Sequence, residues 1–226
     1  MRIKRKLIII LIAILLPVAL ITGGSAVYLG DFYRSDYEAI GAFMPEHSGW
    51  KKEPDNTIVF EPENPSAGFI FYPGGKGECD AYGPLLVRCA EEGVACLLVE
   101  MPGNLAVLDM GAAQRVRELY PEVENWYLAG HSLGGSMAAS FASKADWVDG
   151  LILLAAYSTA DVSRIPTLSI YGTEDGVMNR QKYESSRVNL PEGFREVIIE
   201  GGNHAQFGSY GPQEGDGTAA IMQTAQ

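Results

Sequence analysis

The stretch NWYLAGHSLGGSMAASFASK, residues 125–144, places one serine among glycines where a strand is expected to turn directly into a helix. The apolar run that ends at Gly130 is typical of a buried strand, and a helix-forming sequence begins at Leu133. Gly130 and Gly134 leave room for a turn at which larger side chains would clash. We therefore expect the hydroxyl of Ser132 to stand above the sheet, over a helix N-terminus whose free N–H groups suit an oxyanion.

Short apolar runs alternate with segments of helical periodicity along most of the chain. Strands are predicted at 57–61, 67–72, 94–100, 125–130, 151–156, 167–172 and 195–200, and helices at 81–93, 106–120, from 133 onward and at 178–187. This alternation predicts an α/β fold, a mostly parallel, doubly wound sheet with helices on both faces. Because ligands of such sheets bind beyond the carboxyl ends of the strands, the loops that follow the strands are the expected location of any chemistry.

A serine hydroxyl is a weak nucleophile until a base takes its proton. Of the three histidines, His204 directly follows the last predicted strand, at the sheet edge where Ser132 is expected. His47 precedes the first predicted strand and is interpreted as a surface residue. His131 adjoins the serine, but neighbours at a sharp turn point in different directions, so its predicted role is packing. His204 is the predicted base.

The base needs an acid that orients it. Asp175 lies just past the carboxyl end of the strand predicted at 167–172 and is the favoured candidate. Glu174 next to it and Asp161 after the preceding strand are the alternatives. An aspartate before a glycine is also common in turns, which would explain the residue without any catalytic role.

The loop after the strand at 67–72 reads YPGGKGE and carries two consecutive glycines. Gly74 and Gly75 allow the backbone to approach a substrate oxygen closely. We expect the N–H of Gly75 or Lys76 to donate to an oxyanion, together with the N–H of Leu133. The other interpretation is a plain glycine turn between a strand and a helix.

The N-terminus differs from everything after it. Four cations within MRIKRK precede residues 7–30, which carry no charge over 24 residues, enough to cross the ~20-residue thickness of a membrane core. The cations predict a cytoplasmic N-terminus and an exported remainder. A cleaved signal peptide is the alternative, with secretion as its consequence. The expected organisation is an anchor at 1–30, a connector that packs as a helix at 31–56 and a catalytic domain at 57–226.

Composition excludes some functions. The formal net charge is −11, and removal of the four N-terminal cations makes the remainder still more acidic, so no binding to nucleic acid is expected. The three cysteines have no zinc-site spacing, and no metal site is predicted. Cys96 is interpreted as a buried apolar side chain; a bridge between Cys79 and Cys89 is not expected, although the sequence leaves it open.

Residues 57–210 resemble the α/β-hydrolase superfamily. The phrases FIFYPGGKGECDAYGPL, AGHSLGGSMA, YGTEDG and GGNHAQFGSYGPQEGDG are similar to small, dienelactone-hydrolase-like members associated with membranes. The resemblance implies a triad of Ser132, Asp175 and His204, in the chain order of that family, and neither metal nor organic cofactor. Only about ten residues separate the strands at 151–156 and 167–172, so no large cap is expected over the serine.

These observations predict a serine hydrolase that cleaves carboxylic esters through an acyl-enzyme, with a small acyl ester as substrate. One alternative is a thioesterase or acyl transferase that acts on lipid-linked or cell-wall acyl groups, which the predicted anchor at 7–30 favours. Another is an anchored binding protein that has lost activity, which the presence of all three triad residues disfavours. Acyl and alcohol specificity and oligomeric state have no sequence signal.

Overall fold

The computed structural model describes residues 2–43, 50–53, 57–60, 65, 67–121 and 123–226. His47 lies outside these residues. The chain divides into two units, Met1–Phe32 and Tyr33–Gln226. The second unit holds the sheet and every candidate catalytic residue.

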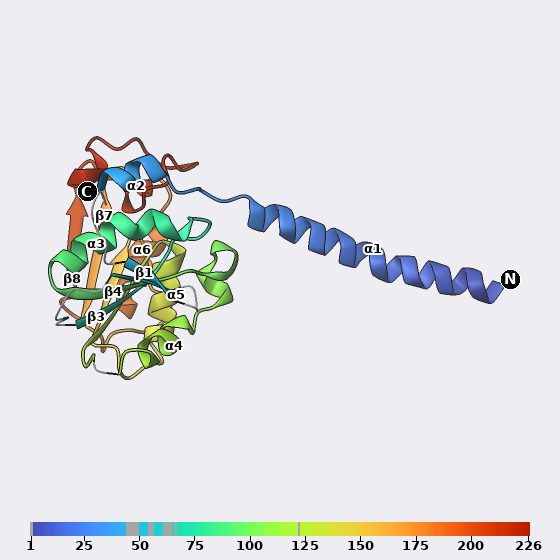
Figure 1. Ribbon diagram of the computed structural model, residues 1–226, viewed down its shortest axis with the longest axis horizontal. Helices are drawn as coiled ribbons and strands as arrows, with labels where there is room; N and C mark the ends of the chain where they lie inside the picture. Colours follow the sequence, from blue (N-terminus) through green and yellow to red (C-terminus); the bar gives the residue numbers. More distant parts are fainter. Residues whose placement is uncertain (1, 44–49, 54–56, 61–64, 66, 122) are drawn as a thin grey trace. The chain divides into compact units, whose positions relative to one another are not determined.

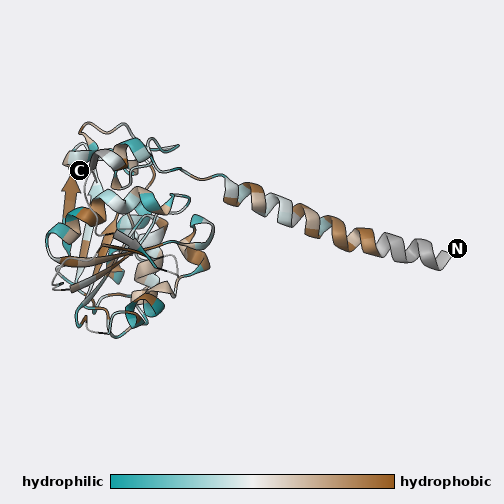
Figure 2. Cartoon of the chain, in the orientation of Figure 1, coloured by the Kyte–Doolittle hydropathy of each residue, from teal (hydrophilic) through white to brown (hydrophobic). Residues whose placement is uncertain are grey.

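The first unit is one helix, α1 (Arg2–Gly30). Its segment Leu11–Gly30 is long and apolar enough to cross a membrane by length and composition, as expected for residues 7–30, and a signal sequence has the same properties. Hydrophobic residues recur along the coloured part of this helix in Figure 2.

An eight-stranded sheet forms the centre of the second unit (Figure 1). Its strands are β1 (Trp50–Lys52), β2 (Thr57–Phe60), β3 (Ala67–Tyr72), β4 (Val94–Val99), β5 (Trp126–His131), β6 (Gly150–Leu154), β7 (Thr167–Gly172) and β8 (Arg195–Ile199), in the order β1-β2-β4-β3-β5-β6-β7-β8. The pairs β1–β2 and β2–β4 are antiparallel and all others are parallel, which confirms the predicted mostly parallel sheet.

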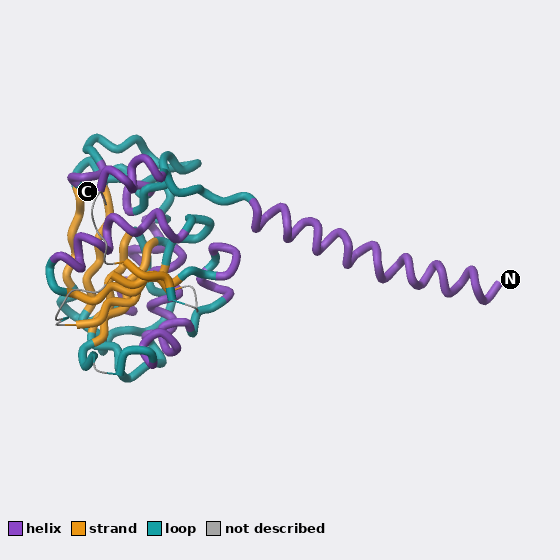
Figure 3. The backbone as a smooth tube through the Cα atoms, viewed as in Figure 1, coloured by secondary structure: helices purple, strands orange, loops and turns teal. Residues whose placement is uncertain are grey.

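Helices cover both faces of this sheet. They are α2 (Tyr37–Phe43), α3 (Gly83–Glu91), α4 (Ala112–Glu118), α5 (Leu133–Ala142) and α6 (Arg180–Ser186). Successive strand residues alternate between two cores: Ile70 packs in the core that includes α4 and α5, and Phe71 packs in the one that includes α3. In Figure 3 the helices lie on both sides of the strands. Burial on both faces explains why the central strands read as continuous apolar runs.

Two expectations need correction. The helix predicted at 106–120 is a 3-10 turn, Ala106–Leu108, followed by the shorter α4, because Gly111 is a poor helix former and Asp109 instead binds Arg115 at 2.7 Å. The connector at 31–56 does contain a helix, α2, but it also supplies β1, which pairs with β2 and extends the sheet. A three-residue strand is too short to show a periodicity.

The cysteines in the described chain are all free thiols. Cys96 is fully buried in the core under α3, as predicted for a small apolar side chain.

Candidate active site

Ser132 lies at the single-residue turn between β5 and α5 and has φ 52° and ψ −121°. A residue other than glycine rarely adopts a positive φ, so the turn is strained. Its flanking glycines are required by close approach. A Cβ added to Gly134 would lie 2.2 Å from the carbonyl oxygens of Tyr72 and Pro73, and one on Gly130 would lie 2.5 Å from the Gly134 backbone. The predicted sharp turn from strand to helix is therefore present.

The hydroxyl of Ser132 has no hydrogen-bond partner among the described residues, whereas its backbone is held firmly. The Ser132 N–H donates to the carbonyl of Leu154 at 2.9 Å, and its carbonyl accepts from Ser136 at 3.1 Å. The residue is half-buried and lines a recess of about 250 Å³. Ser132 thus borders this recess with a hydroxyl that no described group engages.

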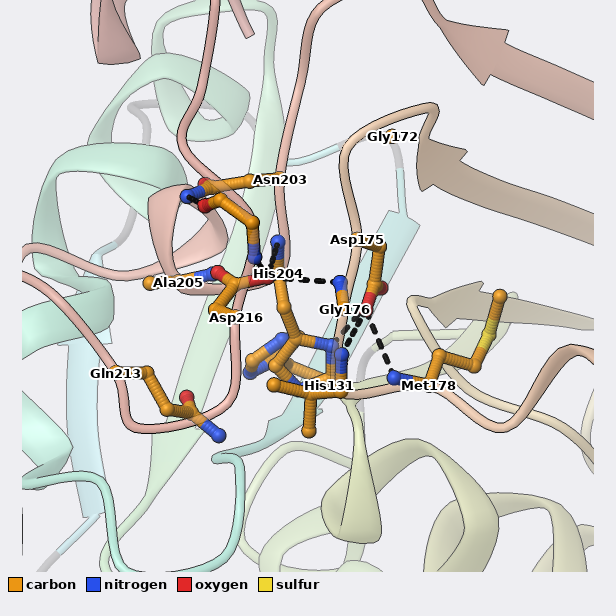
Figure 4. A network of polar contacts seen from close by, with 12 residues as sticks. His131, Gly172, Asp175, Gly176, Met178, Asn203, His204, Ala205, Gln213 and Asp216 are labelled. Carbon is orange, nitrogen blue, oxygen red and sulfur yellow. Dashed lines mark hydrogen bonds and ion pairs between the residues drawn. The ribbon is translucent and has the colours of Figure 1, made fainter.

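Asp175 and His204 form a buried pair at the carboxyl edge of the sheet. Nδ1 of His204 lies 2.9 Å from Oδ2 of Asp175, and their side chains are 1% and 0% exposed. The other carboxylate oxygen accepts from the N–H groups of Val177 and Met178 at 2.9 and 2.8 Å; Figure 4 shows Asp175 between Met178 and the imidazole. Nε2 of His204 is buried and finds no hydrogen-bond partner in the described part of the chain. That nitrogen thus has no hydrogen bond to the Ser132 hydroxyl or to any other described group.

The electrostatics of the pair suit this arrangement. Burial by itself would raise the pKa of Asp175. Three effects outweigh burial and hold this pKa below its ordinary value: the hydrogen bond with His204, the charge of His204, and the hydrogen bonds from the N–H groups of Met178 and Val177. Asp175 is consequently ionised at neutral pH. A carboxylate in this position stabilises an imidazolium and fixes the imidazole with a hydrogen on Nδ1.

Two backbone N–H groups near Ser132 are free, and one predicted donor is not. The N–H groups of Leu133 and Gly75 have no hydrogen-bond partner in the described ranges, and a Cβ on Gly75 would lie 2.9 Å from the Leu133 side chain, so the two residues are neighbours. The Lys76 N–H already donates to the carbonyl of Asn104 at 2.8 Å, which leaves Gly75 as the candidate oxyanion donor of that loop.

His131 packs as expected, and it also connects parts of the site. Its buried ring lies 4.4 Å from the ring of His204, centroid to centroid. Nδ1 of His131 is 2.8 Å from the hydroxyl of Tyr82, which accepts from the Gly74 N–H at 3.0 Å. Burial, with the charge of His204, lowers the pKa of His131 well below its ordinary value. His131 is therefore neutral beside His204 at neutral pH.

Asp216 is a residue of this site that sequence reasoning missed. Its Oδ1 accepts from the backbone N–H groups of Gly176 at 3.1 Å and His204 at 3.2 Å, and its Oδ2 accepts from Ala205 at 2.8 Å (Figure 4). One carboxylate thus ties the loop of Asp175 to the loop of His204. The only sequence signal, an aspartate before a glycine, also marks ordinary turns.

The other candidates lie elsewhere. Glu174 is exposed, and its side chain binds the hydroxyl of its neighbour Thr173 at 3.1 Å. Asp161 accepts from the N–H of Ser163 within its own turn at 2.9 Å. Neither has a hydrogen bond to His204. Among the described residues, no group of histidine, cysteine and carboxylate side chains is arranged to hold a metal ion.

Known proteins resemble this chain in sequence pattern and in fold. The alpha/beta hydrolase family matches residues 68–226, and no curated protein matches. Among solved structures, TT1662 of Thermus thermophilus is 18% identical with a TM-score of 0.56, over 69% of this chain and 90% of that chain. Esterase 2 of Thermogutta terrifontis, phosphoramylated by tabun, is 15% identical with a TM-score of 0.55, over 76% and 90%.

A third structure, the alpha/beta hydrolase MGS-MChE2 from a lagoon-sediment metagenome, is 19% identical with a TM-score of 0.55, over 69% of this chain and 89% of that chain. At these identities the structural matches support the fold alone. The family match covers well over half of the chain and includes the turn at Ser132 and the loops that carry Asp175 and His204. The protein belongs to the alpha/beta hydrolase family.

Proposed function

We propose that the protein is a serine hydrolase that cleaves carboxylic esters through an acyl-enzyme, with Ser132 as nucleophile, His204 as base and Asp175 as the orienting acid. The observation that carries the proposal is the buried Asp175–His204 pair at the same sheet edge as Ser132. Within the described chain, neither Nε2 of His204 nor the Ser132 hydroxyl has a hydrogen-bond partner. Hydrogen bonds between nucleophile and base commonly tighten only when substrate binds.

In the first half of the reaction, Nε2 of His204 takes the proton of the Ser132 hydroxyl while Oγ attacks the carbonyl carbon. The oxyanion accepts hydrogen bonds from the N–H groups of Leu133 and Gly75. The imidazolium then gives its proton to the departing alcohol, and the acyl group remains on Oγ. In the second half, His204 activates a water molecule in the same way, which releases the carboxylic acid and regenerates the hydroxyl.

Fluorophosphonate labelling of the purified chain tests this proposal. The wild type should be labelled on Ser132, and Ser132→Ala should not be labelled. Ser140→Ala is the matched control, since Ser140 lies on α5 and its hydroxyl donates to the carbonyl of Ser136 at 2.9 Å. A fold neighbour that an organophosphorus agent modifies makes this probe a suitable choice. Equal labelling of wild type and Ser132→Ala would refute the proposal.

The recess beside Ser132 predicts a preference for short acyl groups. It lies between α5 and residues 155–157 and 177–179, and its volume of about 250 Å³ is below the ~300–1,000 Å³ typical of pockets for drug-sized ligands. Ala155 and Ala156 are both buried at its edge. Residues 155–166 link β6 to β7 without a helix or strand, so this described segment forms no cap that would enclose a long chain.

We expect kcat/KM for p-nitrophenyl butyrate to exceed that for the dodecanoate by about tenfold or more, because a twelve-carbon chain is too large for the recess and its clash with the walls displaces the ester carbonyl from Ser132. Both esters release the same alcohol, so the comparison isolates the acyl group. Val177→Phe, which places a larger side chain in the recess, should lower the hexanoate-to-acetate ratio of kcat/KM by about tenfold. A flat chain-length profile in both proteins would show that the acyl chain lies elsewhere.

The hydrogen bonds by which Asp216 ties the loop of Asp175 to the loop of His204 form a clamp. Removal of this clamp should lower activity although Ser132, Asp175 and His204 are all retained. Asp216→Ala should lower kcat by about 10²-fold, because a displacement of ~1 Å at the base is enough for that loss. Asp216→Asn keeps one acceptor oxygen and should recover part of it.

Asp161→Ala is the control for this clamp, since Asp161 also accepts a backbone N–H but only within its own turn. Rates are measured per fluorophosphonate-reactive site, below the melting temperature of each variant, so that loss of folded protein does not count as loss of kcat. A kcat of Asp216→Ala equal to that of Asp161→Ala would contradict the prediction.

A further inference from the structure

The first residues of the second unit, from Tyr33 onward, are hydrogen-bonded to the loop that carries Gly75. The Tyr33 N–H donates to the carbonyl of Lys76 at 2.7 Å, and the Glu78 N–H donates to the carbonyl of Tyr33 at 2.9 Å. The Ser35 N–H donates to the carboxylate of Glu78 at 2.7 Å. Tyr33 is therefore hydrogen-bonded to Lys76, the residue that follows the candidate oxyanion donor Gly75.

The same residues also contact the segment that follows His204. The Asp36 N–H donates to the carbonyl of Ser209 at 2.8 Å. The ring of Tyr33 lies 5.6 Å from the ring of Tyr210, and its hydroxyl accepts from the Glu214 N–H at 3.3 Å. Tyr33 thus contacts both the loop that carries Gly75 and the segment that follows His204, at the carboxyl edge of the sheet.

Only two residues separate the apolar helix from this attachment. The helix α1 ends at Gly30, and three Cα–Cα steps lead from there to Tyr33. At 3.8 Å per step these residues span at most about 11 Å. The bound comes from the covalent chain alone and holds for any orientation of the helix. If α1 crosses a membrane, Tyr33 is consequently tethered within about 11 Å of the end of the membrane helix.

We propose that the site acts on esters of amphiphiles that reside in that membrane, and that it removes a short acyl group from them. The inference rests on the proposed function and names its substrate class: the small recess takes the acyl group, and the lipophilic alcohol remains with the bilayer. A short tether keeps the site at a high effective concentration of such esters. Soluble esters gain nothing from the tether.

The test separates membrane-borne from soluble substrates. The full chain is reconstituted in phosphatidylcholine vesicles that contain 1-hexadecyl-2-acetylglycerol, and acetate release is measured beside hydrolysis of p-nitrophenyl acetate in the same sample. Zwitterionic vesicles are chosen because the chain is acidic. In one variant, a helical spacer of thirty residues, six EAAAK repeats and about 45 Å long, is inserted between Gly30 and Asp31. In a second, a Gly-Ser spacer of equal length is inserted there.

We expect the helical spacer to lower acetate release from the vesicles by about tenfold or more, with p-nitrophenyl acetate hydrolysis unchanged. The flexible spacer lets the site return to the surface and should cost less. Equal acetate release from vesicles by all three proteins would overturn the inference. Cleavage in cells that removes residues 1–30, detected as a lower mass of the isolated protein, would also overturn it. A wild type inactive on p-nitrophenyl acetate as well would instead refute the proposed function.

Discussion

His204→Ala should lower kcat for p-nitrophenyl butyrate by about 10⁶-fold, and Ser132→Ala should do the same. The two losses are equal because neither group works without the other: the hydroxyl is unreactive while it keeps its proton, and without the hydroxyl the imidazole has no attacking group held against the ester carbonyl in the acylation step. The buried Nε2 of His204 has no further hydrogen-bond partner in the described chain that would give it a second task.

The double variant makes the argument strict. Ser132→Ala combined with His204→Ala should be no slower than either single variant, since the remaining acceleration comes from substrate binding and the oxyanion donors. Steady-state rates at high enzyme concentration measure this, with circular dichroism as the check on folding. Losses that multiply in the double variant would mean that the two residues act independently, and the triad would be wrong.

The sheet was predictable from sequence because burial on both faces leaves a direct pattern. The runs at 67–72, 94–100 and 151–156 contain no internal polar position, and a strand covered on both faces needs none. Their ends agree with β3, β4 and β6 to within two residues.

The candidate site was predictable where a local constraint forces the residue type. The turn at Ser132 needs glycine at 130 and 134 because the chain passes within contact distance of its own backbone, and that need is visible in five residues. The polar network around the site leaves no such trace. The hydrogen bond between Asp216 and Gly176 joins residues 40 positions apart, and the one between Tyr82 and His131 joins residues 49 positions apart. Contacts at such separations show no local sequence pattern. The sequence equally allowed Lys76 as an oxyanion donor, because the hydrogen bond from its N–H to the carbonyl of Asn104 leaves no sequence pattern.

Asp175→Asn should lower kcat by about 10⁴-fold while KM changes little. The carboxylate accepts the Nδ1 hydrogen of His204 and stabilises the imidazolium that forms during the reaction. An asparagine that keeps the bonds to Val177 and Met178 turns an N–H group toward Nδ1, which moves the imidazole hydrogen to Nε2 and blocks proton acceptance there. The loss thus follows from the wrong tautomer, and no unfolding is needed to explain it.

Glu174→Gln is the matched control for this variant, because Glu174 adjoins Asp175, carries the same charge and is exposed. Its kcat should stay within about twofold of wild type, as for most surface substitutions. The depressed pKa of Asp175 sets the pH range of the comparison: the carboxylate is ionised above its ordinary pKa, and its contribution is lost only as the pH falls through the lower folded value. Rates are therefore compared at neutral pH and above. A large loss in Glu174→Gln with little in Asp175→Asn would exchange the roles of the two carboxylates.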